Sequence, residues 1–174
     1  MEISRFHDVI GPPPLGGDVR SDWGPVESRT GRSLPADYKE FVSAYGPGSL
    51  NGQLYLFHPR AADGENGLRL EFLWQEAGYV YEQMSLIDPE SVPSPVYPSH
   101  GGLVPVARSI SGNHVFLAPP AHADENWSVA LEMGAWVFLP MMFTEFLWAA
   151  LHGRLEAPIL EGEPTFEAEG DMEP

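Results

Sequence analysis

The clearest hydrophobic pattern of the chain lies between Pro35 and Gly46, and it predicts an amphipathic helix. Apolar side chains recur there at positions i, i+3, i+4 and i+7, namely Tyr38, Phe41, Val42 and Tyr45. That spacing places them on one face of an α-helix. Proline at the first helical position and glycine just after the last are typical of helix ends. We therefore predict a helix that begins at Pro35 and packs this face against a core.

Three further segments show the helical period. A short helix is predicted from Asp22, whose carboxylate is expected to cap it, to Thr30. A longer helix is predicted over 70–84, with apolar residues at Leu70, Leu73, Trp74, Ala77, Tyr81 and Met84. A last helix is predicted after Thr144, the expected N-cap, and ends before Gly153.

The period changes to that of β-strands in two regions. Residues 53–58 are apolar on both faces, as in an interior strand. Residues 103–110 and 114–118 flank Ser111-Gly112-Asn113 and predict a hairpin, and two more strands are predicted at 127–132 and 135–139. Because the strands cluster along the chain, the sequence predicts a single α+β domain. We expect a mainly antiparallel sheet of about five or six strands with helices packed against it.

The ends of the chain differ in composition from its middle. Residues 1–21 contain Pro12-Pro13-Pro14 and Gly16-Gly17, so they are expected to form a Pro/Gly-rich N-terminal arm. Residues 22–153 carry all the periodic segments and are expected to form the folded domain. Residues 154–174 are acidic and contain proline and glycine, which predicts a disordered tail.

The charge of the chain is strongly negative. Nine Lys and Arg stand against 25 Asp and Glu, giving a formal net charge of -16. This surface is expected to repel nucleic acid and anionic membranes and to attract a basic partner. Solubility alone would also account for the acidity. No apolar run reaches about 18 residues and no secretory leader is visible, so a cytoplasmic location is expected.

Patterns of chemically reactive residues are weak. The chain has no cysteine, and its six histidines lack the spacing of metal ligands. His100-Gly101-Gly102 is similar to an oxyanion-hole segment, but no G-x-S-x-G nucleophile accompanies it. Acidic neighbours such as Asp88 and Glu90 are more typical of solvated loops than of catalytic pairs. The sequence therefore predicts no catalytic residue, cofactor or metal site.

The order of elements, with particular residues at the joints, resembles the SUKH superfamily. The first part carries Trp23, Glu27, Leu34-Pro35, Asp37-Tyr38, Phe41 and Tyr45-Gly46-x-Gly48. The second part carries Gly102-Leu103-Val104-Pro105, Asp124-Glu125-Asn126-Trp127 and Thr144-Glu145-Phe146-Leu147. The likeness covers roughly residues 22–153. That superfamily includes yeast cell-wall-assembly regulators and many bacterial immunity proteins.

The resemblance implies a non-enzymatic, protein-binding role. Bacterial members commonly bind and block secreted polymorphic toxins, many of them nucleases, and the family offers no catalytic residues to carry over. An acidic chain suits a basic toxin, because a nuclease presents positive charge to its substrate. Acids that steer association and aromatic anchors then give the expected partner contacts: Glu27, Asp37, Glu40, Tyr55, Asp124, Glu125 and Trp127.

Two other functions remain open at this point. A regulatory scaffold that binds an endogenous protein is the alternative, as in the yeast members. An enzyme of unrecognised type is the third possibility, and a cavity with a perturbed titratable group would indicate it. The sequence leaves the oligomeric state and the identity of the partner open.

Overall fold

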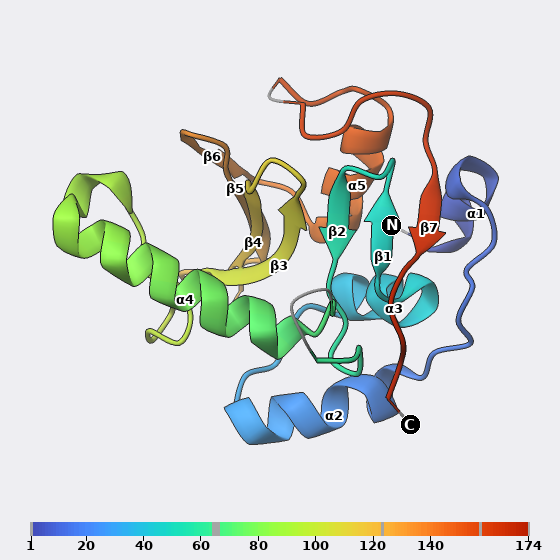
Figure 1. Cartoon of the computed structure of the whole chain (residues 1–174), viewed down its shortest axis with the longest axis horizontal. Coiled ribbons are helices and arrows are strands. Elements are labelled where there is room, and N and C mark those ends of the chain that lie inside the picture. Colours follow the sequence, from blue (N-terminus) through green and yellow to red (C-terminus); the bar gives the residue numbers. More distant parts are fainter. Residues whose placement is uncertain (1, 64–66, 123, 157, 174) are drawn as a thin grey trace.

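The protein is built on one antiparallel sheet with helices on both of its faces (Figure 1). The computed structural model describes residues 2–63, 67–122, 124–156 and 158–173. The strands are β1 (Gly48–Leu50), β2 (Leu54–Leu56), β3 (Val104–Ser109), β4 (His114–Ala118), β5 (Ser128–Glu132), β6 (Trp136–Leu139) and β7 (Phe166–Ala168). The α-helices are α1 (Ser4–Ile10), α2 (Val19–Thr30), α3 (Ala36–Tyr45), α4 (Leu70–Ile87) and α5 (Phe143–Leu151), with a short 3₁₀ helix η1 (Pro89–Ser91).

The α+β class and the antiparallel sheet are confirmed, whereas the strand number is seven rather than five or six. The order across the sheet is β6-β5-β4-β3-β2-β1-β7. Consecutive strands pair antiparallel from β1 to β6, and β7 returns to pair with β1. The sequence missed β1 and β7 because each has only three residues, too few to display a period.

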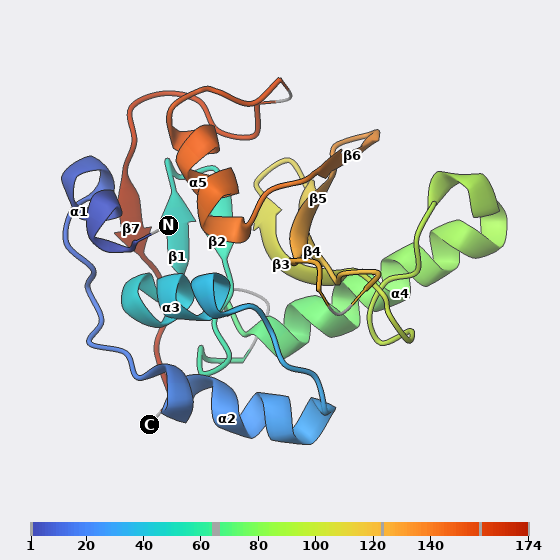
Figure 2. The same cartoon turned by 180° about the vertical axis from the view of Figure 1, so that it is seen from behind.

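The two faces of the sheet carry separate layers of the core. On β4, Val115 and Leu117 belong to the main core, whereas Phe116 between them belongs to a second cluster with Ala77 and Tyr81 of α4. This is the alternation that a pleated strand imposes. Figures 1 and 2 show α4 on one side of the sheet and α3 and α5 on the other.

The predicted helix after Pro35 is confirmed, and it forms the centre of the main core. It begins at Ala36, and Gly46 follows its last residue at φ 78°. The ring of Phe41 lies 4.9 Å from that of Phe6 in α1 and 4.8 Å from that of Tyr45. Tyr38 packs edge-on against Phe143 of α5 at 4.9 Å. One face of α3 therefore joins α1 and α5 through aromatic contacts.

The N-terminal arm is more ordered than its prolines suggested. It contains α1, whose Phe6 is fully buried, and α2 already begins at Val19. Asp18, not Asp22, caps α2, because its Oδ1 accepts a hydrogen bond from the Arg20 amide at 2.8 Å. The three prolines lie in the connection between the two helices, so they interrupt helix without excluding it on either side.

The prediction of a disordered tail is wrong for the described part of residues 154–174. Ile159 and Leu160 are buried, and Phe166 of β7 pairs with Leu50 of β1. Gly48 makes this pairing possible, since a Cβ there would overlap the Glu167 carbonyl oxygen and the Phe166 ring. Composition alone could not reveal a contact between segments more than 100 residues apart. None of the helices in the described part is long and apolar enough to cross a membrane.

Replacement of Leu160 tests whether the C-terminal segment is part of the core. Leu160→Ala is expected to lower the free energy of unfolding by about 2–4 kcal/mol, because it leaves a cavity at a site that is 4% exposed. Leu86→Ala makes the same change at a position that is 73% exposed and should cost less than about 0.5 kcal/mol. Urea unfolding measures both. Equal small effects would mean that the segment does not dock.

Candidate functional site

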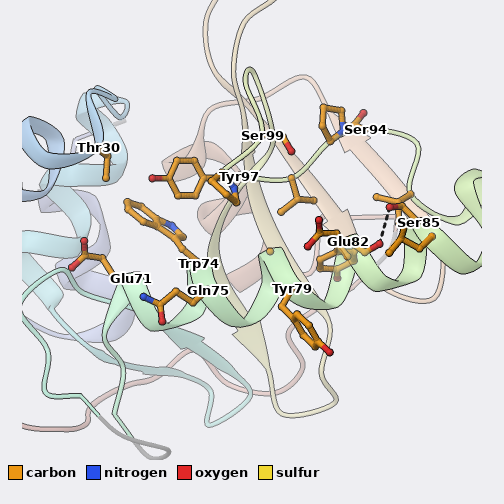
Figure 3. Close-up of a pocket in the computed structure, with 17 residues that line it drawn as sticks. Thr30, Glu71, Trp74, Gln75, Tyr79, Glu82, Ser85, Ser94, Tyr97 and Ser99 are labelled. Carbon is orange, nitrogen blue, oxygen red and sulfur yellow. Dashed lines mark hydrogen bonds between the residues drawn. The ribbon is translucent and has the colours of Figure 1, made fainter.

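A cavity of about 740 Å³ opens between α4 and the loop of residues 92–99 (Figure 3). Trp74, Tyr79 and Tyr81 of α4 line it together with Val96 and Tyr97 of the loop. Its size falls in the range of small-molecule sites, roughly 300–1,000 Å³. Trp74 and Tyr97 pack with ring centroids 5.0 Å apart, so aromatic surface forms much of the wall.

The outer face of α4 is apolar as well, and this is the most unusual feature of the surface. Tyr79, Val80, Leu86 and Ile87 are exposed, by 66%, 40%, 73% and 86%. Tyr79 and Leu86, and likewise Val80 and Ile87, are seven residues apart, so each pair shares one helix face. We call these four residues the α4 patch. Large exposed apolar side chains that gather on one helix mark interaction surfaces more often than single ones do.

Three exposed carboxylates lie close in sequence to the α4 patch and form no ion pair with a described base. Glu71 and Glu76 of α4 are paired, with Arg29 at 2.7 Å and Arg108 at 2.5 Å. By contrast, Glu82, Asp88 and Glu90 are exposed, and no described base forms an ion pair with any of them.

The direction of α4 adds to this negative charge. The last turn of the helix contains no basic residue. A helix C-terminus carries about half a negative charge, so these acids make a potential that is already negative more negative. A cationic group of a binding partner would neutralise this negative potential.

The sequence missed the α4 patch, although the signal was present. The helical period identifies the buried face, and the predicted helix ends at Met84, before Leu86 and Ile87. The i, i+7 repeat of Tyr79 with Leu86 was visible in the sequence. Nothing in it said that this second apolar face lacks a covering element.

The structure does not bring the seven predicted partner contacts together at one groove. Asp37 is only 7% exposed, and its Oδ2 accepts hydrogen bonds from the Thr144 amide at 2.9 Å and the Thr144 hydroxyl at 3.1 Å. It therefore stabilises the first turn of α5, which begins at Phe143, so Thr144 is not its N-cap. Glu27 accepts from the Leu34 amide and from Lys39, both at 2.8 Å, and links α2 to α3.

The remaining predicted contacts are more accessible but scattered. Glu40 is exposed on α3, and Tyr55 is half-buried on β2. Asp124 and Glu125 are exposed in the connection before β5, and Trp127 is half-buried beside them. Of the seven, Trp127 lines a groove, which lies next to Arg32 and Tyr97.

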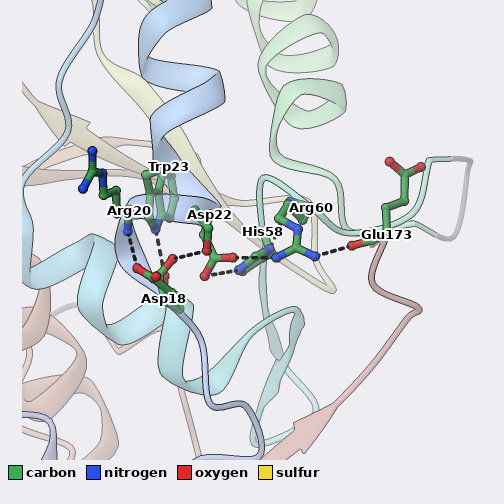
Figure 4. A network of polar contacts seen from close by, with 9 residues as sticks. Asp18, Arg20, Asp22, Trp23, His58, Arg60 and Glu173 are labelled. Carbon is green, nitrogen blue, oxygen red and sulfur yellow. Dashed lines mark hydrogen bonds and ion pairs between the residues drawn. The ribbon is translucent and has the colours of Figure 1, made fainter.

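A buried polar cluster ties α2 to the C-terminal segment (Figure 4). Asp22 is almost fully buried and receives Arg60 Nη1 on Oδ1 at 3.1 Å, while His58 Nε2 lies 3.7 Å from Oδ2. Arg60 Nη2 also donates to the Glu173 carbonyl oxygen at 2.7 Å. His58 Nδ1 accepts the Arg60 amide at 3.0 Å, so the proton of a neutral ring sits on Nε2 and faces Asp22. Both nitrogens are thus directed at groups of the fold rather than at a cavity.

A second buried cluster holds α4 to the sheet. The Tyr81 hydroxyl lies 2.9 Å from His114 Nδ1 and 3.3 Å from Glu132 Oε2. Burial raises the pKa of Tyr81 above its ordinary value, and the Glu132 carboxylate raises it further, so Tyr81 keeps its proton. The hydroxyl therefore bridges β4 and β5 as a neutral group.

Both buried histidines are neutral at pH 7. Burial lowers the pKa of His58 to about 4, against an opposing effect of Asp22 and with a smaller contribution from Arg60. Burial, assisted by Arg108, also lowers the pKa of His114 to about 4. No group of three or more His, Asp or Glu side chains within the described ranges could hold a metal ion.

Comparisons with known proteins identify no relative. No protein-family model matches the chain, and neither a curated protein nor a solved structure does.

Replacement of Asp37 tests its structural role. Asp37→Ala is expected to lower the free energy of unfolding by about 1–3 kcal/mol, because it removes a charged acceptor from the first turn of α5. Glu40→Ala, on the exposed face of the same helix, should change it by less than about 0.5 kcal/mol. Chemical denaturation measures the difference. Similar values for both variants would contradict the role of Asp37.

The buried histidines predict a loss of stability at mildly acidic pH. An unfolded histidine titrates near pH 6.5, whereas both folded pKa values are about 4, so the unfolded chain binds more protons between these values. The contribution of the two neutral histidines to the free energy of unfolding is therefore fully present above about pH 6.5, and it is lost as the pH falls towards 4. Each histidine should account for a loss of about 2 kcal/mol between pH 7 and pH 5.

Thermal or urea unfolding across this pH range measures the effect. His58→Gln and His114→Gln should each flatten the profile, whatever their stability at pH 7. His122→Gln, at an exposed position, should leave its slope unchanged. A profile that is equally steep in all three variants would rule out the buried histidines as its cause.

Proposed function

We propose that this protein is a non-enzymatic binding domain that recognises a basic protein through the α4 patch. The observation that supports it is an exposed apolar helix face, close in sequence to exposed carboxylates that form no ion pair with a described base. Apolar anchors supply affinity when they are desolvated, and surrounding charge supplies orientation and speed of association. Tyr79 and Leu86 are the anchors in this proposal, and Glu82, Asp88 and Glu90 are the steering charges.

The charge of the chain argues for a basic partner rather than a second copy. Two copies that joined their α4 patches would bring Glu82, Asp88 and Glu90 of both chains into one interface. Each chain also carries a net charge of -16, so long-range repulsion opposes self-association. A basic partner reverses both effects and compensates the negative end of the α4 dipole.

We further propose that the partner is a toxin and that the protein acts as its immunity protein in the cytoplasm. The resemblance of residues 22–153 to the SUKH superfamily supports this class of partner. A nuclease toxin presents a basic surface to nucleic acid, and an acidic inhibitor can occupy that surface. The same charge disfavours binding of this chain to nucleic acid or to an anionic membrane.

A regulatory scaffold with an endogenous partner is the alternative, since the α4 patch would serve it equally well. The two functions differ in the identity of the partner and in its effect on cells. An enzymatic role has less support, because His58 and His114 are neutral and occupied by the fold. Tyr81 lines the cavity and has a raised pKa, but it keeps its proton, and its hydroxyl is held by His114 and Glu132.

A binding assay with matched variants tests the proposal. The protein is immobilised and exposed to an extract of its native host at low and high salt, and retained proteins are identified by mass spectrometry. The double variant Tyr79→Ala/Leu86→Ala should bind the partner at least about tenfold more weakly, since truncated anchors typically cost more than 1 kcal/mol. Glu82→Lys should slow association more than it speeds dissociation. It should also weaken the dependence of the association rate on salt concentration.

The control is Ile110→Ala, which shortens an exposed apolar side chain outside the patch. It should bind like the unaltered protein. A basic partner that kills cells, and from which co-expression of this protein protects them, supports the immunity role. A harmless endogenous partner that depends on the patch supports the scaffold. A partner that binds the double variant undiminished would refute recognition through α4.

A further inference from the structure

A second groove, of the opposite electrostatic character, lies where α2 ends. It has a volume of about 550 Å³ and is lined by Thr30, Arg32, Ser33, Tyr97, His100 and Trp127, among others. None of the described residues that line it is acidic, although the chain contains 25 Asp and Glu. None of the four residues of the α4 patch lines it either. We call it the Arg32 groove.

Arg32 is fixed in place by contacts that leave its charge uncompensated. Gly31 takes a left-handed conformation, φ 65°, and ends α2, so Arg32 leaves the helix axis. Its Nη1 donates to the Gly102 carbonyl oxygen at 3.1 Å, and its guanidinium lies over the Tyr97 ring at 5.0 Å. Two neutral contacts thus hold a half-buried cation in one orientation.

Arg32 differs in this respect from most bases of the chain. Five of the nine Lys and Arg form ion pairs with described carboxylates, namely Arg29, Lys39, Arg60, Arg69 and Arg108. Arg32 has no such partner within the described residues, even though acids outnumber bases. A guanidinium held by one nitrogen keeps further N–H groups free, and its planar fork suits an oxyanion.

The walls of the groove favour a flat group next to that oxyanion. Tyr97 and Trp127 supply aromatic surface, and Pro98 and Pro119 supply rigid apolar surface. Stacking of a planar ring on such side chains lowers the free energy of binding. Ser33 and His100 are exposed and add donors for an anion or a sugar hydroxyl.

We propose that the Arg32 groove binds a small aromatic oxyanion, in which a phosphate or carboxylate is joined to a planar ring. Arg32 receives the oxyanion, and Tyr97 and Trp127 hold the ring. The negative end of α2 and the net charge of the chain oppose the ligand, whereas the uncompensated Arg32 offsets this locally. Binding is therefore sensitive to salt.

NMR titration of the full chain tests the groove. Adenosine 5′-monophosphate and benzoate are the two probes, which distinguish a phosphate from a carboxylate, and adenosine and inorganic phosphate are the separated halves. At least one of the two probes should give saturable shifts at Arg32, Ser33 and the Trp127 indole N–H. Adenosine and inorganic phosphate should each bind at least tenfold more weakly than adenosine 5′-monophosphate if that probe binds.

Two arginine variants separate the groove from general electrostatics. Arg32→Gln should weaken binding at least tenfold, whereas Arg154→Gln, at an exposed position outside the groove, should not change it. Arg32→Lys retains the charge but loses the planar fork of the guanidinium, so an intermediate affinity is expected. This variant keeps the test valid if Arg32→Gln does not fold. Absence of saturable shifts with both probes at millimolar concentration would overturn the proposal. So would equal losses in Arg32→Gln and Arg154→Gln.

Discussion

The attachment of α4 to the second face of the sheet is the contact on which both proposed surfaces depend. Trp74 Nε1 donates to the Pro105 carbonyl oxygen at 2.9 Å, and Tyr81 reaches His114 and Glu132 on β4 and β5. These polar anchors are spaced along the buried face of the helix, with Ala77 between them against the second cluster. A helix that is apolar on both faces could bury either one. The hydrogen bonds on one face decide which face is buried and leave Tyr79 and Leu86 outside.

The distribution of charge over the molecule depends on where its few Lys and Arg side chains are used. Most of the few Lys and Arg are used within the fold, where they link elements that are distant in sequence, as Arg108 of β3 does with Glu76 of α4. Most of the acids without an ion pair among the described residues are exposed, with Asp37 as a buried exception, so the negative net charge is concentrated on the surface. Arg32 differs from the bases that form ion pairs within the fold. It has no ion-pair partner among the described residues, and no described acid lines its groove, so no charged contact within the described fold accounts for its position.

Local patterns predicted what local forces decide. The stripe of α3 and the hairpin of β3 and β4 were readable because each signal lies within a short stretch of neighbouring residues. β7 and the role of Asp37 were not, since each depends on a partner more than 100 residues away. Asp37 was correctly placed in a first helical turn, but the helix terminus it stabilises is that of α5. For the candidate site, Trp127 was named from sequence, whereas the grooves depend on which loops meet in space.

The two proposed surfaces are close in space, yet the geometry gives no mechanism that couples them. Tyr97 lies between them, with Arg32 over its ring at 5.0 Å and Trp74 at 5.0 Å on the α4 side. Coupling requires an element with two arrangements that both ligands bias. Here both ends of the stack are tied to backbone carbonyls, Trp74 to Pro105 and Arg32 to Gly102. A ligand in the Arg32 groove therefore finds its site already formed, and occupancy there should leave the affinity of the α4 patch unchanged.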